Sequence, residues 1–258
     1  MLSAYVVMVS FNLYINTNDV SAIRCNFNGT TTVPASELTT GDNGQYEYSI
    51  VVAPAQIQDS ITVEVLDGNG NVDRTYITTV ADYCNQIIDG NFSAETKALA
   101  KAVLDYGKAA SDFFDFNTDA YNAQDYYNTT PFNFDTSILV ASATGIEVNE
   151  VRYVATSTPD LRFEVNLTES EAHQLVARTD KGYSSKFVKV DDDVILQVQE
   201  IPAAKFDEAI TITISGGKTI VYTPLSYAYM ASKSDNAKLA KLGNAIAYYW
   251  QAADALFE

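Results

Sequence analysis

Histidine, cysteine and positive charge are scarce in this chain of 258 residues. The single histidine, His173, lies among polar residues in TESEAHQLVA, far from either cysteine in sequence. Nucleophilic catalysis by a Ser-His-Asp or Cys-His set, and most zinc sites, depend on histidine. Two carboxylates could serve a glycosidase, but 33 acidic residues give no basis for choosing a pair. We therefore predict a surface histidine, no catalytic residue, no metal site and no enzymatic activity, with a hydrolase as the least favoured class.

The chain has 16 basic and 33 acidic residues, which gives a net charge of −17. Such a surface repels phosphate backbones and anionic lipid, so we expect no nucleic-acid partner. No apolar run approaches the roughly 20 residues that a membrane-spanning helix needs, so we expect no membrane insertion. The apolar start, MLSAYVVMVSF, lacks the basic region of a signal peptide, and a strand is the better interpretation. If the natural protein is exported, this sequence corresponds to a mature fragment.

Only two cysteines are present, Cys25 and Cys84. Cys25 shares an alternating face with Ile23 and Phe27, which favours a buried thiol. A disulfide between Cys25 and Cys84 is the alternative.

The most informative pattern is a repeat between the segments 93–114 and 238–257. An offset of 143 pairs Leu99 with Leu242, Val103 with Ile246, Tyr106 with Tyr249, Ala109 and Ala110 with Ala252 and Ala253, and Phe114 with Phe257. These positions recur at helical spacing, so both segments are predicted to be helices that bury the same stripe.

The residues before each helix also correspond. ITVEV at 61–65 and ITITI at 210–214 alternate as half-buried strands do, and each is followed by a turn, DGNGN at 67–71 or SGGK at 215–218. Thr79 and Ser93 are predicted helix caps in the first copy, and Thr223 is predicted to cap a helix whose first residue is Pro224. Two copies of one unit are therefore expected.

We predict an α+β fold of two tandem modules, each a β-sandwich-like strand region followed by a helix hairpin. Module 1 spans residues 1–116 and lacks the first strands, because the segment 137–157 has no clear counterpart in it. Module 2 spans residues 135–258. Residues 117–134 form a linker rich in Asn and aromatic residues, which we expect to lie against one or both modules.

The two helix regions resemble a module of large secreted surface or cellulosome-type proteins from anaerobic Gram-positive gut bacteria. Its pattern runs Pro-Ala, a strand pair, Tyr-Ser-Val-x-x-Tyr, and a helix that ends Leu-x-Tyr-Gly-x-x-Ala-Gln-x-Phe. The first copy keeps these positions as Tyr83, Leu104, Tyr106, Gly107, Ala110 and Phe113 or Phe114. The second copy departs from it at Ala247, Trp250 and Asp254. The resemblance implies an extracellular or cell-surface location, further domains beside this one, and a non-catalytic role.

Tyrosine is abundant, with 17 residues beside a single Trp, in a chain rich in Asn, Asp and Thr. Aromatic rings stack on sugars while amides bond the hydroxyls, so this composition suits carbohydrate binding. The second copy places Tyr229, Tyr248 and Trp250 where the first has Asn85, Asp105 and Gly107, which we interpret as solvent-facing positions. The candidate carbohydrate-stacking residues are Trp250, Tyr248, Tyr229 and the linker residues Tyr126 and Tyr127. Tyr248 and Trp250 lie about 200° apart on a helix and cannot form one flat platform. The alternative is that these rings pack against the linker or the other module.

No cofactor is expected, and calcium is the only candidate cation. Asp67, Asn69, Asn71 and Asp73 begin like a calcium loop, but Val72 and Thr78 stand where the EF-hand pattern needs Gly and Glu. A hairpin turn is the better interpretation there, and a solvated turn for the acidic residues 191–193. The leading prediction is a non-catalytic extracellular module that binds polysaccharide. The alternative is a structural spacer or an adhesin that contacts a surface protein.

Overall fold

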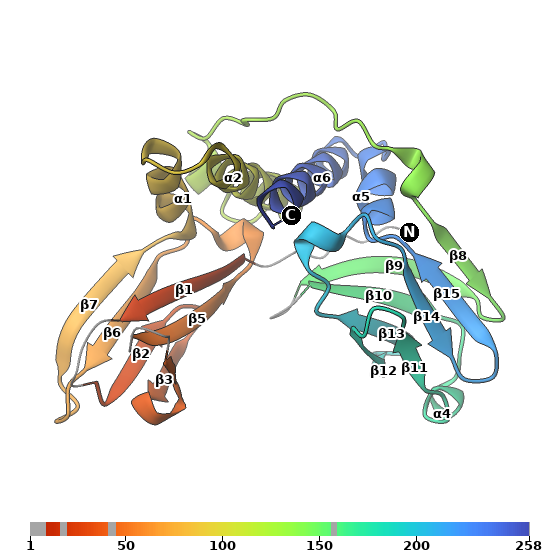
Figure 1. The fold of residues 1–258 in the computed structure, drawn as a ribbon, viewed down its shortest axis with the longest axis horizontal. Coiled ribbons are helices and arrows are strands. Elements are labelled where there is room, and N and C mark those ends of the chain that lie inside the picture. The colour runs from red at the N-terminus through yellow and green to blue at the C-terminus, as the bar shows by residue number, and fades with distance from the viewer. Residues whose placement is uncertain (1–8, 16–19, 41–44, 156–158, 258) are drawn as a thin grey trace.

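The computed structural model describes residues 9–15, 20–40, 45–155 and 159–257. The fold mixes helices with four antiparallel sheets, as the α+β prediction requires. Figure 1 shows the long helices together above two separate sets of strands, which descend on either side. Residues 1–8, which carry most of the predicted N-terminal strand, lie outside the described residues. The remainder of that segment begins a strand at Val9.

The N-terminal half contains two antiparallel sheets, with strand orders β1-β5-β4 and β3-β2-β6-β7. Buried side chains from both sheets, such as Ile15, Ile23, Val52 and Val63, belong to one core. The strands are β1 (Val9–Ile15), β2 (Ala22–Asn26), β3 (Thr30–Pro34), β4 (Thr39–Thr40), β5 (Tyr46–Val52), β6 (Ile61–Leu66) and β7 (Val72–Thr78). The helices that follow are α1 (Val80–Asp89), α2 (Ala94–Phe114) and the short α3 (Thr118–Tyr121).

The C-terminal half also has two antiparallel sheets, with orders β12-β13-β10-β9 and β11-β14-β15-β8. The strands are β8 (Ala141–Thr144), β9 (Val148–Ala155), β10 (Pro159–Val165), β11 (Ala177–Thr179), β12 (Ser184–Val190), β13 (Asp193–Gln199), β14 (Ile210–Ile214) and β15 (Lys218–Tyr222). The helices are the short α4 (Glu169–Ala172), α5 (Leu225–Ser232) and α6 (Ala237–Phe257). One-turn 3-10 helices lie at 35–37, 54–56, 136–138 and 203–205.

The order of elements agrees between the halves. Hairpin β6-β7 is followed by α1 and α2, and hairpin β14-β15 by α5 and α6. Strand β2 pairs with β6 as β11 pairs with β14, and β1 pairs with β5 as β10 pairs with β13. Strands β8 and β9 have no counterpart in the described part of the N-terminal half. Among the described strands β7 is therefore at the edge of its sheet, whereas the corresponding β15 is paired with β8.

The predicted alternation in the two hairpins is confirmed. Ile61, Val63 and Val65 of β6 are buried, as are Ile210, Ile212 and Ile214 of β14. The first hairpin turn is held by the Asp67 carboxylate, whose Oδ1 accepts the backbone N–H groups of Asn69 and Asn71. Hydrogen bonding to the charged form lowers the pKa of Asp67. The segment is a hairpin turn, as predicted.

Two of the three predicted helix caps are confirmed. The hydroxyl oxygens of Thr79 and Ser93 accept the backbone N–H groups of Asp82 and Thr96, at 2.9 and 3.1 Å. The third is wrong, because α5 begins at Leu225 and the residue before it is Pro224. The Thr223 hydroxyl is held elsewhere: it donates to the carbonyl of Ile138 and accepts the N–H of Val140.

The long helices α2 and α6 pack against each other, and each also packs on its short partner, α1 or α5. The rings of Tyr106 and Tyr249, which the repeat aligns, stack with centroids 5.7 Å apart. Ala109 and Ala110 of α2 lie in the core of the C-terminal half. The helices thus bury their stripes against each other as well as against the sheets. The buried stripe of α6 ends before Phe257, the last residue of that helix, which is 74% exposed.

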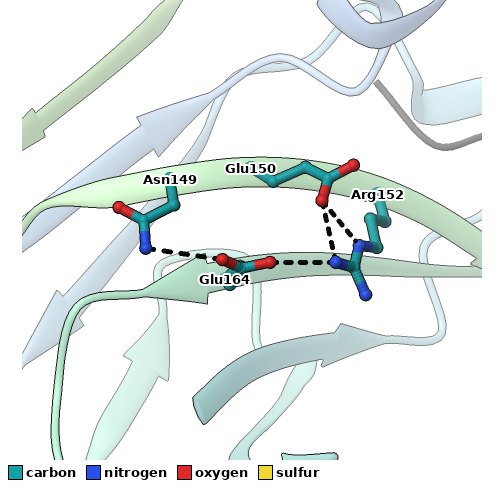
Figure 2. A network of polar contacts seen from close by, with 4 residues as sticks. All are labelled: Asn149, Glu150, Arg152 and Glu164. Atoms are coloured by element: carbon teal, nitrogen blue, oxygen red, sulfur yellow. Dashed lines mark hydrogen bonds and ion pairs between the residues drawn. The ribbon is translucent and has the colours of Figure 1, made fainter. Parts of the chain in front are cut away.

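Charged side chains form a network between β9 and β10 (Figure 2). Arg152 donates to a carboxylate oxygen of Glu150 from both Nε and Nη2, at 3.0 and 2.8 Å, and to Glu164 at 2.9 Å. Asn149 donates to the other Glu164 oxygen at 3.4 Å. The network lies on one face of the sheet, and the core residue Phe163 lies on the other face.

Cys25 is a buried free thiol, as predicted, and Cys84 is also buried and free, so the alternative disulfide is not formed. Burial raises the pKa of Cys25, and it raises the pKa of Cys84 to about 12. Among the helices described, none is long and apolar enough to cross a membrane.

Candidate functional site

A hollow of about 350 Å³ opens where α2, the linker and α6 meet, and we call it the α2–α6 hollow. It combines aromatic, amide and charged side chains, which is the chemistry of a polar-ligand site. Its lining residues are Asp105, Tyr126, Asn128, Thr129, Thr130, Pro131, Ala240, Lys241, Asn244, Ala245 and Tyr248. Two of the five predicted stacking residues, Tyr126 and Tyr248, are among them.

The linker lies against the helices, as expected. Tyr121 is fully buried, and its hydroxyl donates to the Pro54 carbonyl at 3.1 Å. The Gln124 side chain donates to the Leu104 carbonyl of α2 at 2.9 Å. In Figure 1 the chain then passes over the helices on its way to β8. One wall of the hollow is therefore fixed by contacts that begin in the N-terminal half.

Asp105 fixes the next part of the linker. Its carboxylate accepts the N–H of Tyr127 at 2.8 Å, and the N–H and side-chain amide of Asn128 at 2.9 and 3.0 Å. Burial raises the pKa of Asp105, while these hydrogen bonds act in the opposite direction. The prediction of a solvent-facing position is wrong here, because Asp105 is only 2% exposed. Gly107 is buried as well, against Ile57, so it does not mark a bare surface.

Tyr248 supplies the aromatic wall from α6. Its hydroxyl lies 3.0 Å from the Thr130 hydroxyl and donates to the Thr130 carbonyl at 3.2 Å. Its ring makes an edge-to-face contact with Phe132, with centroids 5.0 Å apart. The N–H of Phe132 in turn donates to the side-chain oxygen of Asn244 at 2.7 Å. These contacts hold a half-buried ring in place, so a ligand need not order it.

Tyr126 enters the hollow from the linker side. Its hydroxyl donates to Asp112 at 3.0 Å, and burial together with that carboxylate raises its pKa. The ammonium groups of Lys108 and Lys241 lie 5.4 and 5.5 Å from the ring centroid, within cation–π distance. This ring is therefore less open to stacking by a neutral sugar than that of Tyr248.

The other three candidates lie apart from the hollow. Tyr127 is exposed and lines a neighbouring polar hollow of about 380 Å³, with Lys101 5.4 Å from its ring centroid. Trp250 packs edge-on against Phe132, and Tyr229 against Phe134, with centroids 6.1 and 5.4 Å apart. The alternative of packing against the linker describes these last two rings. Their partners in the linker are the phenylalanines Phe132 and Phe134.

The remaining candidates for chemistry lie at the surface. His173 directly follows α4, and its side chain is 75% exposed. It lies 4.0 Å from the carboxylate of Glu169, the first residue of that helix. Residues 191–193 fall at the turn between β12 and β13. The described residues contain no group of three or more His, Cys, Asp or Glu side chains that could hold a metal ion.

No protein family, curated protein or solved structure was found to match this chain.

Lys241, Asn244 and Asn128 were not among the predicted site residues. Asn244 lies one turn and Lys241 two turns before Tyr248 on α6, so helical spacing around that candidate would have identified them. Asn128 carries no comparable signal, because its position depends on the buried Asp105 carboxylate.

Proposed function

We propose that this chain is a pair of tandem modules, each a β-sandwich with a helix hairpin, that binds polysaccharide without catalysis at the α2–α6 hollow. The agreement of strand order between the halves, and the stacking of the aligned Tyr106 and Tyr249, support the two-module description. An extracellular or cell-surface setting is part of the proposal, and it rests on the resemblance of the helix regions.

The observation that carries the binding proposal is the position of the Tyr248 ring at the wall of a hollow that amide, hydroxyl and charged residues also line. An aromatic ring held by Phe132 and Thr130 can contact the apolar face of a sugar at little entropic cost. Asn128 and Thr129 line the same hollow, and within the described residues neither the Asn128 side-chain oxygen nor the Thr129 hydroxyl makes a hydrogen bond. Such groups suit sugar hydroxyls.

The test is affinity electrophoresis in gels that contain starch, xylan or mucin glycans, with sedimentation on insoluble cellulose. We expect at least one polysaccharide to retard the protein, and Tyr248→Ala to weaken that binding about three- to tenfold. Tyr76→Ala is the matched control, because Tyr76 is a partly exposed tyrosine on β7, away from the hollow. Retention of full binding by Tyr248→Ala would contradict this placement of the site.

A structural spacer is the second candidate function. It is favoured by the packing of α2 against α6, where the stacked rings of Tyr106 and Tyr249 join the two halves through side chains. Absence of retardation by every polysaccharide, whether neutral or acidic, would support the spacer. Release of soluble sugar from the same polymers would instead indicate a hydrolase.

A further inference from the structure

Three lysines gather around the linker tyrosines of a strongly acidic protein. Lys108 and Lys241 lie over Tyr126, and Lys101 lies over Tyr127, each 5.4 to 5.5 Å from the ring centroid. None of the three forms an ion pair with a carboxylate in the part of the chain that the structure describes. With only 16 basic residues against 33 acidic ones, this grouping is a local departure from the overall charge.

Two nearby carboxylates, Asp105 and Asp112, are engaged within the protein. Asp105 is buried and accepts three N–H groups from the linker, and Asp112 accepts the Tyr126 hydroxyl. The Lys108 ammonium also donates to the Tyr121 carbonyl, at 2.9 Å. Lys241, by contrast, is exposed at the hollow, where its ammonium lies 5.5 Å from the Tyr126 ring centroid and forms no ion pair with any described residue. Of the two charged side chains that line the α2–α6 hollow, Asp105 is buried and Lys241 is exposed, so the charged group within reach of a ligand is the Lys241 ammonium.

We propose that the α2–α6 hollow is specific for acidic polysaccharides, whose carboxylate or sulfate groups bind the Lys241 ammonium while the sugar ring contacts Tyr248. This inference rests on the proposed function and adds the class of ligand. A hydrogen bond between an ammonium and an anionic group is stronger than one between neutral groups, and the hollow is partly shielded from water. General attraction does not account for such binding, because a protein of charge −17 repels a polyanion.

The test compares gels that contain polygalacturonate or dextran sulfate with gels that contain xylan or starch at equal mass concentration. We expect stronger retardation by an acidic polymer, and weaker retardation as salt is added. The two acidic polymers distinguish carboxylate from sulfate as the bound group. Lys241→Gln should weaken binding about tenfold, which is the worth of one charge-assisted contact. Lys186→Gln removes the same charge from an exposed position on β12, far along the chain, and should leave binding unchanged.

One outcome is that neutral and acidic polymers retard the protein equally and that Tyr248→Ala loses this retardation. That outcome would overturn the acidic specificity, while the proposal of polysaccharide binding at the hollow would stand. An equal effect of Lys186→Gln and Lys241→Gln would also overturn it, because the loss would then reflect net charge. No retardation by any polymer would overturn both proposals. Far-ultraviolet circular dichroism of each variant establishes that a loss of binding is not a loss of fold.

Discussion

Arg152 is the residue on which the polar network of β9 and β10 depends. Its guanidinium contacts the carboxylates of Glu150 and Glu164, whose side chains are only 11% and 17% exposed (Figure 2). Without it, two partly buried carboxylates would face each other across adjacent strands, with little water to separate their charges. Like charges opposite each other in a sheet are destabilising.

Arg152→Ala should therefore lower the free energy of unfolding by about 1–3 kcal/mol, because it removes the positive charge that pairs with two partly buried carboxylates. The measurement is urea denaturation followed by circular dichroism. Lys189→Ala is the control, since Lys189 pairs with Glu169 at an exposed site and should cause no measurable change. Equal effects of the two substitutions would show that the Arg152 network behaves as an ordinary surface ion pair.

At the scale of single elements, the sequence was most informative where the cause of the structure is local. The alternation of Ile61, Val63 and Val65 and the caps at Thr79 and Ser93 depend on neighbours within a few residues, and they were predicted. Asp105 was placed at the surface, because nothing near it in sequence shows that residues 127 and 128 return to cover it. For the same reason the α2–α6 hollow could be predicted only as far as two of its aromatic residues.

Two helix glycines permit close packing, and they differ in what they face. A Cβ atom on Gly107 would overlap the Ile57 side chain, whereas on Gly243 it would lie 2.5 Å from the Ser232 nitrogen and 2.6 Å from the Ala228 oxygen. The first clash is mainly with the end of a side chain, and the second is with backbone. A side chain at position 243 would therefore be harder to accommodate between α6 and α5 than one at position 107 beside Ile57.

Gly107→Ala should lower the free energy of unfolding by about 1–3 kcal/mol through overpacking, partly offset by up to about 1 kcal/mol of helix propensity. Addition of Ile57→Val, which removes the Ile57 Cδ1 atom, should recover part of the loss. Gly243→Ala should be the more damaging change, because no side-chain truncation relieves contact with backbone atoms. Denaturation of the two alanine variants and the double variant tests this. Additive effects of Gly107→Ala and Ile57→Val would contradict the proposed contact.

Across the whole molecule, tyrosines join the parts of the fold. Tyr121 anchors the linker beneath α2, Tyr106 and Tyr249 join the long helices, and Tyr153 packs edge-on against Phe206 in the C-terminal core. Burial raises the pKa of Tyr121, Tyr153 and Tyr249. The tyrosines thus make the fold sensitive to alkali, in a protein whose surface is already strongly negative.

Stability should accordingly fall in alkali. Tyrosine in the unfolded chain ionises near pH 10, while the folded state holds the pKa of its buried tyrosines higher, and raises that of the partly buried Tyr48 to about 12. The folded state then binds more protons than the unfolded state, so this stability is fully present below about pH 10 and is lost as the pH rises through the folded values. Urea denaturation at pH 8, 10 and 11 should show a steady fall in the free energy of unfolding.

Tyr153→Phe isolates the effect, because the Tyr153 hydroxyl is buried and has no hydrogen-bond partner among the described residues. Its removal should raise the free energy of unfolding at pH 8 by up to about 2 kcal/mol, since a buried unsatisfied hydroxyl is costly. The fall in stability between pH 10 and 11 should also become shallower, because one fewer tyrosine ionises preferentially in the unfolded chain. A wild-type protein whose tyrosines all ionise near pH 10 without loss of fold would contradict the argument, because no buried tyrosine would then be held protonated by the core.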